Sequence, residues 1–450
     1  MADHTTREVI LQIMMRVTRD GEFSHTAIRE ALDAHRQFTR QEKAFDKAAA
    51  GGTLERMIEL DYIIDQFASV KTAQMKPAIR NILRTAVYQM RYMDSVPPQA
   101  ACNEAVKLAQ KMGFYNLKGF VNGVLRTIAR SEDRITYPPE SNRMEYLSVK
   151  YSMPRWIVKM WSDEFGPDIT ETVLEAFLKP HPLTVRLPEN EEVRRAALES
   201  LKRQGVIVKK APYLPYAYYL SETRDLTELA AFRNGKIYPQ DISSMLVAEC
   251  AAPKAGDNIL DLCAAPGGKS LHLADKMNGF GMVEARDVTD EKVDLIRENI
   301  QRMDCINVHA VVRDATLYDT QCEGKMDIVL CDVPCSGLGV AGRKPDIKYR
   351  LTRDGIEELV LLQRSILNNA AAYVRPGGTL IYSTCTIGHM ENEDNIRWFE
   401  QNYPFRLESL DPYLPRDLHR LTTEKGYLQL LPGIHETDGF FIARFRKETL

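Results

Sequence analysis

The sequence predicts an α/β protein with an all-helical N-terminal part, a small α+β module and a C-terminal doubly wound domain. Two observations predict this order. Apolar residues recur at helical spacing through residues 1–135. From residue 239 onward, short apolar runs alternate with helical segments, as in a parallel sheet covered by helices. A chain of 450 residues is long enough for two or three such domains.

The N-terminal domain, residues 1–135, is predicted to be a helical bundle. Its first helix begins with a capping box, because Glu8 follows Thr5 by three positions. Pro97-Pro98 interrupts the pattern and opens another helix. Further amphipathic segments cover residues 54–67, 79–90 and 119–129.

The middle of the chain is predicted to hold a linker and a small module. Residues 131–150 are polar and contain Pro138-Pro139, which favours a linker. Residues 148–238 are expected to form an α+β module of the ferredoxin-like kind. Its predicted elements are a strand at 184–187, a helix capped by Asn190 and a strand at 206–208.

The C-terminal domain, residues 239–450, is predicted to be a parallel sheet closed by two further strands. The expected strands are 259–262, 281–285, 308–312, 328–331 and 379–382, and the expected helices are 269–277, 290–303 and 356–373. Residues 427–430 and 439–445 are expected to pair as the closing strands.

Composition restricts the class of protein. Hydrophobic content of 44% and charged content of 27% are ordinary for a globular protein. No apolar stretch reaches the roughly 20 residues of a membrane span, and no signal-peptide run opens the chain. The eight cysteines lack metal-ligand spacing. We therefore expect a cytoplasmic protein with reduced thiols, no metal and no membrane contact. We also expect a monomer, although the composition does not determine the oligomeric state.

Two cysteines directly follow predicted buried strands. Cys335 lies in Asp332-Val333-Pro334-Cys335-Ser336-Gly337, and Cys385 lies in Ser383-Thr384-Cys385-Thr386. A cysteine within a strand is usually a core residue, but these two lie in the turns after their strands. Ligands gather at the carboxyl ends of parallel strands, and a thiolate is a strong nucleophile. The pair therefore suggests covalent chemistry.

A cofactor turn is predicted at Cys263-Ala264-Ala265-Pro266-Gly267-Gly268-Lys269, between a strand and a helix. Small residues let the backbone approach a ligand closely. Gly268-Lys269-Ser270 resembles the end of a phosphate-binding loop, but Cys263 stands where that motif needs glycine. The dinucleotide fingerprint is also absent.

Three aspartates follow successive predicted strands: Asp287, Asp314 and Asp332. Asp287 comes 19 residues after Gly268, near the spacing at which an acid meets a ribose hydroxyl in this architecture. Each alone is more often a surface or capping residue. Together they suit a ligand with ribose, amino and cationic groups, such as S-adenosyl-L-methionine.

These motifs resemble those of the NOL1/NOP2/Sun RNA cytosine-5 methyltransferases. The resemblance lies in Cys263 to Lys269, Asp332 to Ser336 and Ser383 to Thr386. Residues 98–106 and 120–126 resemble NusB. This combination is similar to the bacterial RsmB-type members, which act on a cytosine of 16S ribosomal RNA. It implies a Rossmann-like class I methyltransferase domain with a NusB-like RNA-binding head.

The resemblance also implies roles for individual residues. Residues 263–269 would line the S-adenosylmethionine pocket, Asp287 would hold the ribose and Asp314 would lie near the adenine. Asp332 would border both the cofactor and the target base. Cys385 would be the nucleophile and Cys335 would assist product release. Arg286 departs from the family pattern, since an apolar residue usually precedes the ribose aspartate, and with Glu284 it makes that strand unusually polar.

The implied reaction requires a thiolate and an exposed base. Addition of Cys385 to C6 of cytosine would make C5 nucleophilic, and a protonated Asp332 could donate to N3. Cys335 would act as a base or through water. The base must be single-stranded or flipped out. Basic residues after Cys335 are the predicted RNA contacts: Arg343, Lys344, Lys348 and Arg350.

Two other functions fit parts of the sequence. DNA cytosine methyltransferases use the Pro-Cys cysteine as nucleophile, so the additional Thr-Cys motif argues against a DNA substrate. A non-catalytic RNA-binding or antitermination factor would fit the NusB-like head but not the cofactor turn with both cysteines. Only the domain combination points to 16S ribosomal RNA.

Overall fold

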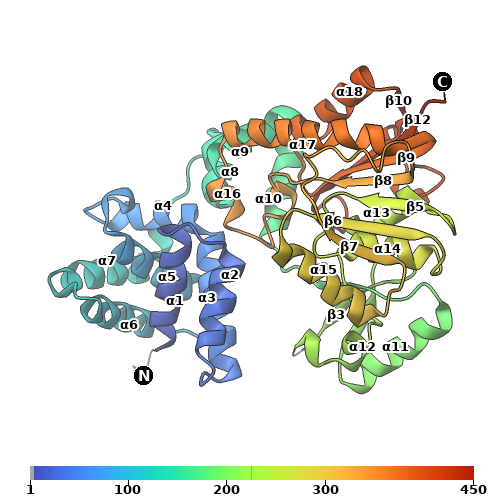
Figure 1. Ribbon diagram of the computed structural model, residues 1–450. Coiled ribbons are helices and arrows are strands. Elements are labelled where there is room, and N and C mark those ends of the chain that lie inside the picture. Colours follow the sequence, from blue (N-terminus) through green and yellow to red (C-terminus); the bar gives the residue numbers. More distant parts are fainter. Residues whose placement is uncertain (1–4, 224, 450) are drawn as a thin grey trace. The chain divides into compact units, whose positions relative to one another are not determined.

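The computed structural model describes residues 5–223 and 225–449, which form two compact units (Figure 1). The first unit comprises Met1–Lys179 and Ala341–Arg350, and the second comprises Pro180–Val340 and Leu351–Leu450. Residues 148–179 thus group with the N-terminal helices rather than with the small α+β module. The three-domain division of the sequence, 1–135, 148–238 and 239–450, stays a prediction.

The first unit is helical, as the sequence predicts. Its long helices are α1 (Thr6–Thr18), α2 (Ser24–Ala34), α3 (Arg40–Glu55), α4 (Met57–Phe67), α5 (Pro77–Tyr92), α6 (Pro98–Lys111), α7 (Lys118–Arg130), α8 (Arg143–Lys150), α9 (Arg155–Phe165) and α10 (Pro167–Phe177). In the predicted capping box, the Thr5 amide donates to Glu8. The predicted linker is wrong from residue 143 onward, because α8 buries Leu147 and Val149 there.

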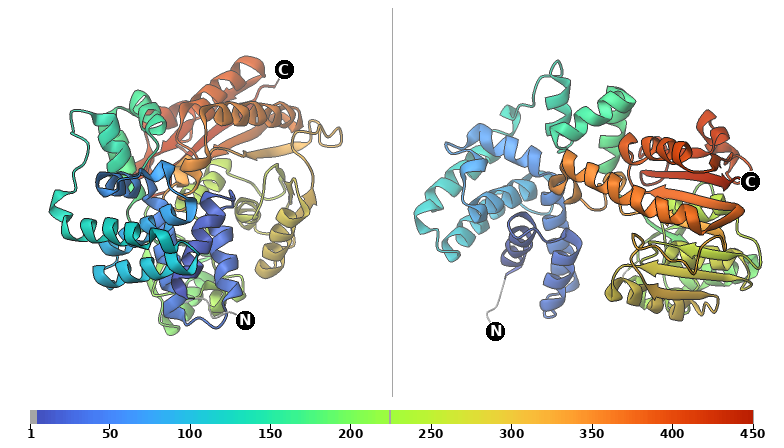
Figure 2. Two further views of the ribbon diagram at one scale, coloured as in Figure 1. Left: turned by 90° about the vertical axis from the view of Figure 1, so that its left-hand side faces the viewer. Right: turned by 45° about the horizontal axis from the view of Figure 1, so that its top comes forward.

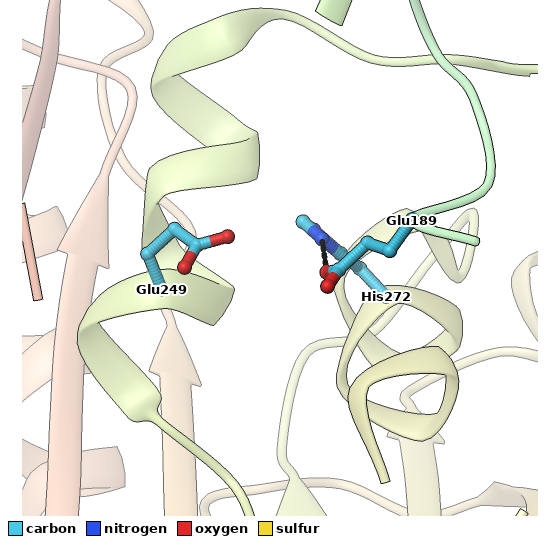
Figure 3. Close-up of side chains that lie close together, drawn as sticks. All are labelled: Glu189, Glu249 and His272. Atoms are coloured by element: carbon cyan, nitrogen blue, oxygen red, sulfur yellow. Dashed lines mark ion pairs between the residues drawn. The ribbon is translucent and has the colours of Figure 1, made fainter. Parts of the chain in front are cut away.

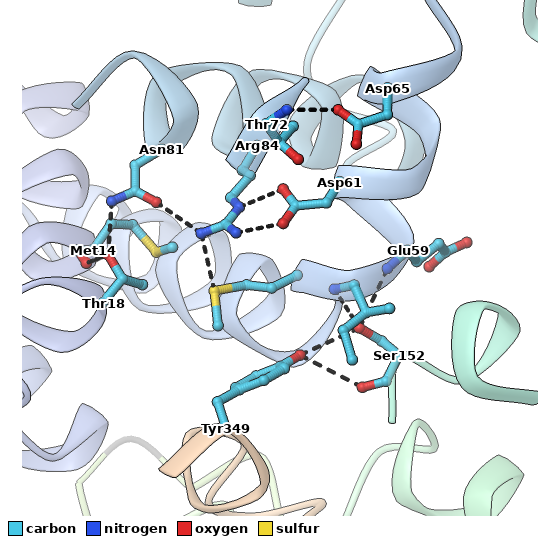
Figure 4. A network of polar contacts seen from close by, with 12 residues as sticks. Met14, Thr18, Glu59, Asp61, Asp65, Thr72, Asn81, Arg84, Ser152 and Tyr349 are labelled. Carbon is cyan, nitrogen blue, oxygen red and sulfur yellow. Dashed lines mark hydrogen bonds and ion pairs between the residues drawn. The ribbon is translucent and has the colours of Figure 1, made fainter. Parts of the chain in front are cut away.

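A segment from the second half of the chain, Ala341–Arg350, belongs to this helical unit. It contains the short helix α16 (Ile347–Arg350). The buried Asp346 accepts hydrogen bonds from the amide and the hydroxyl of Ser24 at the start of α2. The Tyr349 hydroxyl lies 3.2 Å from the Ser152 hydroxyl and reaches a polar network that also contains Arg84 (Figure 4).

The second unit contains a small antiparallel sheet in the order β2-β3-β1-β4. Its strands are β1 (Leu183–Arg186), β2 (Ile207–Lys210), β3 (Ala217–Ser221) and β4 (Tyr238–Pro239). Helix α11 (Glu191–Arg203) begins as predicted, with the Asn190 side chain accepting from the amides of Glu192 and Val193. The sequence did not predict β3 or β4, which complete the α+β module.

The larger sheet carries the predicted parallel strands. Its strands are β5 (Asn258–Asp261), β6 (Met282–Asp287), β7 (Val308–Val312), β8 (Met326–Asp332), β9 (Val374–Thr384), β10 (Phe405–Leu407), β11 (Tyr427–Leu430) and β12 (Phe440–Lys447). The order is β10-β12-β9-β8-β5-β6-β7, with β11 beside β12. Strands β5 to β9 pair in parallel, and the closing strands are antiparallel.

Helices cover both faces of this sheet (Figure 2). One hydrophobic core packs α13 (Ile242–Ala251), α14 (Gly268–Lys276) and α15 (Asp290–Met303) against alternate strand residues such as Ile259 and Ile381. The other packs α17 (Arg353–Tyr373) and α18 (Glu393–Asn402) against their neighbours, such as Leu260 and Tyr382. The short helices are α12 (Ala230–Arg233) and α19 (Leu421–Lys425). This is the doubly wound architecture predicted from the alternating pattern.

The polar strand β6 is explained by its ion pairs. Arg286 is 3% exposed, and its guanidinium contacts Glu284 at 2.5 Å and Asp319 at 2.9 Å. A charge this deep requires such partners. Arg286 therefore packs in β6 and leaves the following Asp287 at the strand end. Among the described helices, none is both long and apolar enough to cross a membrane.

Candidate active site

The turn between β5 and α14 holds the predicted cofactor residues. Gly267 has a φ of +101°, a conformation that favours glycine, and a Cβ on Gly268 would lie 2.9 Å from the ring of Tyr238. Asp261, at the end of β5, is fully buried and accepts from the Ser270 hydroxyl at 2.5 Å. Its Oδ1 has no hydrogen-bond partner among the described residues, and burial raises the pKa of Asp261 to about 7. The turn thus combines a left-handed glycine with an unsatisfied buried oxygen.

Two of the predicted aspartates already make local hydrogen bonds. Asp287 ends β6, and its carboxylate accepts from the amides of Ala265 at 3.0 Å and Val288 at 2.8 Å. It therefore fixes the cofactor turn from the neighbouring strand. Asp314 follows β7 and accepts from the amide and hydroxyl of Thr316 at 2.8 and 2.7 Å. Its Oδ1 holds its own turn.

Asp332 joins the cofactor turn to the strand that leads to Cys385. Its Oδ2 lies 2.6 Å from Nζ of Lys269, and its Oδ1 accepts from the Ser383 hydroxyl at 2.7 Å. Burial lowers the pKa of Lys269, but the charges of Asp332 and Cys385 outweigh it and raise that pKa overall. Lys269 is thus a partly buried cation that is paired with Asp332 and close enough to Cys385 for their charges to interact.

The structure brings Cys335 and Cys385 together. Strands β8 and β9 pair in parallel with Asp332 opposite Ser383, so both turns leave the same edge of the sheet. The two Sγ atoms lie 3.3 Å apart. The hydrogen bond to Cys385, reinforced by burial, raises the pKa of Cys335 well above its usual range. Either thiol can act as the donor in this contact.

The backbone around the thiols is also fixed. The Gly339 amide donates to the Cys385 carbonyl at 3.0 Å, and the Gly439 amide donates to the Gly339 carbonyl at 2.9 Å. A Cβ on Gly339 would lie 2.1 Å from the Gly439 carbonyl oxygen. Only glycine fits at this crossing, which ties the Cys335 turn to the Cys385 turn and to the start of β12.

Sequence reasoning missed Glu391, a buried carboxylate that supports both turns. It is 1% exposed, and burial raises its pKa. Its oxygens accept from the amide of Ser336 at 2.8 Å, from the Ser336 hydroxyl at 2.5 Å and from Nε2 of Gln363 at 3.0 Å. The Ser336 hydroxyl lies 2.8 Å from that of Thr386. An acid six residues after Cys385 carries no local signal that would have revealed this role.

Two of the four predicted basic RNA contacts are instead used within the helical unit. Lys348 is 4% exposed, its Nζ donates to the Glu55 carbonyl at 2.7 Å, and burial lowers its pKa to about 7. The Arg350 guanidinium contacts Asp346 at 3.3 Å. The prediction of a direct RNA contact is therefore wrong for the buried Lys348. Arg343 and Lys344 are exposed.

A second cluster contains Glu189, Glu249 and His272, with ligand atoms close enough for a metal ion (Figure 3). Nζ of Lys276 lies 2.9 Å from Glu189 and 2.7 Å from Glu249, so an ammonium already neutralises both carboxylates. Burial lowers the pKa of His272 to about 3. We describe this cluster as an ion-pair network that joins β1 and its loop to α13 and α14.

Comparison with known protein families identifies each part of the chain. Residues 248–446 match the family model of the 16S rRNA methyltransferase RsmB/F. Residues 4–130 match the NusB family, and residues 153–227 match the ferredoxin-like domain of RsmF/B-like methyltransferases. A relative named probable ribosomal RNA small subunit methyltransferase B, from Bacillus subtilis, is 35% identical over the whole of both chains. The chain belongs to the RsmB/F family.

Other relatives of this RsmB/F-family chain agree. A probable ribosomal RNA small subunit methyltransferase B from Synechocystis is 31% identical and covers 98% of this chain and 99% of its own. The solved structure of PH0851 is 28% identical, covers 99% of each chain and has a TM-score of 0.81. A methyltransferase homologue from Pyrococcus horikoshii is 27% identical, covers 68% of this chain and 99% of its own, and has a TM-score of 0.57. The fold and the enzyme class, an rRNA methyltransferase, follow from these matches.

Proposed function

We propose that this enzyme transfers a methyl group from S-adenosylmethionine to C5 of cytosine 967 in 16S ribosomal RNA, through a covalent bond between Cys385 and C6. The proposal is carried by one observation. Two thiols 3.3 Å apart lie beside the Lys269–Asp332 pair, at the edge of the sheet where the cofactor turn begins. The names of the relatives support a ribosomal RNA substrate.

The residues of the turn fit S-adenosylmethionine. The unsatisfied Oδ1 of Asp261, the left-handed Gly267 and the acids at the ends of β6 and β8 suit a cationic ligand that also carries hydroxyl groups. Residues 263–269 would hold its methionine part, Asp287 its ribose, and Asp314 would lie near its adenine. When bound, S-adenosylmethionine supplies an electrophilic methyl group.

Cys385 is assigned the nucleophilic role. Its sulfur forms a bond to C6 of the cytosine, the C5–C6 double bond breaks, and the electron pair gives C5 the nucleophilicity it otherwise lacks. The Cys335 thiol and the Lys269 ammonium both face the Cys385 sulfur and stabilise its negative charge. Asp332 accepts a hydrogen bond from the Lys269 ammonium. This geometry therefore does not support the hypothesis that a protonated Asp332 donates to N3 of the cytosine.

Cys335 is assigned to product release. The Cys335 thiol first releases its own proton to solvent, and the C5–H bond then breaks with its proton passing to the Cys335 thiolate, directly or through water. The C5–C6 double bond re-forms, and the C6–S bond breaks with its electron pair returning to Cys385. Cys335 lies within hydrogen-bonding distance of the departing sulfur, which suits this assignment.

Bisulfite sequencing of ribosomal RNA tests the proposal. A strain that lacks this enzyme is complemented with the native chain or with Cys385→Ala. We expect protection of cytosine 967 with the native chain and its loss with the variant. Protection restored by Cys385→Ala would overturn the mechanism, and protection of a different site would overturn the assigned nucleotide. Parallel methyl transfer to RNA and DNA oligonucleotides separates this function from DNA methylation.

A further inference from the structure

A cavity of about 490 Å³ lies in the helical unit, where α2 and α3 meet the segment 342–345. Basic side chains line it: His25 and Arg29 on α2, Lys47 on α3 and Arg343 on the segment. Ile28 and Leu32 form an apolar part of its wall. The cavity is large enough for one nucleotide of a polynucleotide chain.

Glycine keeps one side of this cavity open. A Cβ on Gly51 of α3 would meet no atom within 4 Å, so this position faces open space. A Cβ on the adjacent Gly52 would lie 2.0 Å from the Tyr88 hydroxyl oxygen, so that position packs against α5. The two glycines therefore differ, and only Gly51 leaves room for an occupant.

The segment that closes the cavity is firmly held. Asp346 is 2% exposed and accepts hydrogen bonds from Ser24 at the start of α2. Lys348 donates to the Glu55 carbonyl at the end of α3. Both anchors lie in the chain directly after the wall formed by residues 342–345. This wall belongs to the chain segment that follows the Cys335 turn, so a NusB-like domain alone would lack it.

The charge of the cavity favours an anionic occupant. Arg29, Lys47 and Arg343 are exposed cations. Among the described residues, no carboxylate forms an ion pair with Arg29 or Lys47. Burial, together with the charges of Lys344 and Arg29, lowers the pKa of His25, which places this ring in a positive field. Glu55 is the one acidic residue of the lining, and it lies at the end where Lys348 docks.

We infer that this cavity binds a single-stranded segment of the substrate RNA, with phosphates at Arg29, Lys47 and Arg343 and one base against Ile28 and Leu32. The inference rests on the proposed function, which supplies a ribosomal RNA substrate. Basic groups around an apolar surface are how proteins bind single-stranded RNA. The site adds substrate affinity without taking part in the chemical step.

Surface variants of the full-length enzyme test this inference. In Arg29→Ala/Lys47→Ala, two exposed cations are lost. We expect the KM for a 16S rRNA transcript and the Kd for a labelled fragment around cytosine 967 to rise about ten-fold at physiological salt. The slope of log Kd against log salt should fall by about 1.4, while kcat and the Kd of S-adenosylmethionine stay constant. Gly51→Glu should weaken RNA binding similarly. Lys118→Ala, an exposed lysine on α7, is the control.

The outcomes distinguish a failure of this inference from a failure of the proposed function. If the native enzyme methylates the transcript and both pocket variants bind RNA with the native Kd and salt slope, the inference is wrong. Equal losses in Lys118→Ala would show a diffuse electrostatic effect and would also overturn it. If the native enzyme fails to methylate ribosomal RNA, the proposed function fails, and the Kd measurements still decide whether the cavity binds RNA.

Discussion

The Sγ atoms of Cys335 and Cys385 lie 3.3 Å apart at the ends of two strands that pair in parallel, β8 and β9. The separation in sequence is large, yet the register places Asp332 opposite Ser383 and so brings the two turns together. The hydrogen bond to Cys385, together with burial, raises the pKa of Cys335 well above its usual range. The two thiols thus form one hydrogen-bonded pair, to which the proposed function assigns different roles.

Oxidation should inactivate the enzyme reversibly through this pair. Diamide takes two electrons and two protons from the thiols, and their proximity favours an internal disulfide. We expect loss of methyl transfer with loss of two titratable thiols, and recovery on addition of dithiothreitol. Peptide mapping should find Cys335 joined to Cys385. Modification at other cysteines, with this pair still reduced in the inactive protein, would contradict the prediction.

Lys269→Met should shift the pH dependence of the reaction. Removing the ammonium that faces Cys385 takes away a charge that stabilises the thiolate, so the pKa of Cys385 should rise by about one unit. The acidic limb of the plot of kcat against pH should move to higher pH. The pH dependence of the rate at which iodoacetamide alkylates Cys385 should shift by the same amount. Lys254→Met, at an exposed lysine, is the control. An unchanged alkylation profile in Lys269→Met would show that the cation does not act on the thiol.

Glu391→Gln should lower kcat about ten-fold or more. One carboxylate oxygen becomes an NH2 group, which cannot accept a hydrogen bond, so one of the contacts from Ser336 and Gln363 is lost and the Cys335 turn is less well supported. The Kd of S-adenosylmethionine should change little, and the pH profile should shift because a buried acid near Cys335 is lost. Glu357→Gln, an exposed position on α17, is the matched control. A native kcat in Glu391→Gln would show that catalysis does not depend on the support that Glu391 gives to the Cys335 turn.

Asp46→Asn should alter the pH dependence of stability in the helical unit. Asp46 is fully buried, neither oxygen has a hydrogen-bond partner among the described residues, and burial raises its pKa to about 7. The native state then holds a proton that the unfolded chain releases near pH 4. Its stabilising contribution is present below about pH 4 and is lost as the pH rises through 7.

The Asp46→Asn variant has no titrating group at this position, so its stability does not fall as the pH rises through 7. The Tm of the variant minus the Tm of the native protein should therefore be larger at pH 8 than at pH 5. Thermal unfolding followed by circular dichroism at both values measures the difference. A Tm difference that stays constant with pH would show that Asp46 does not titrate in this range.

The strand ends of the catalytic domain could be predicted from the sequence because each follows a short apolar run. Cys335 and Cys385 therefore lie where the pattern placed them, at the carboxyl ends of β8 and β9. The spacing of Asp287 from Gly268 predicted an acid placed to meet a ribose hydroxyl. In the structure Asp287 accepts from the Ala265 amide, and its contact with a ribose stays a prediction. Periodicity is a local property, and these features are local.

Features that depend on distant partners could not be predicted. The sequence does not explain a charged Arg286 within a strand, because its ion-pair partner Asp319 lies 33 residues away. Glu391 gains its role from Ser336 and Gln363, on two other elements. The basic loop predicts that Lys348 contacts RNA. In the structure, tertiary contacts bury Lys348, and its ammonium donates to the Glu55 carbonyl. Charge in a sequence does not reveal which charges the fold will use.

Trapping of the RNA adduct in Cys335→Ala tests the central claim, two thiols with separate roles, most directly. The variant keeps Cys385, so addition to C6 and methylation of C5 proceed, and release fails. With labelled 16S rRNA fragment and S-adenosylmethionine, we expect a protein–RNA band that survives a denaturing gel and disappears in Cys335→Ala/Cys385→Ala. Free RNA alone in the single variant, or an adduct that persists in the double variant, would contradict the account.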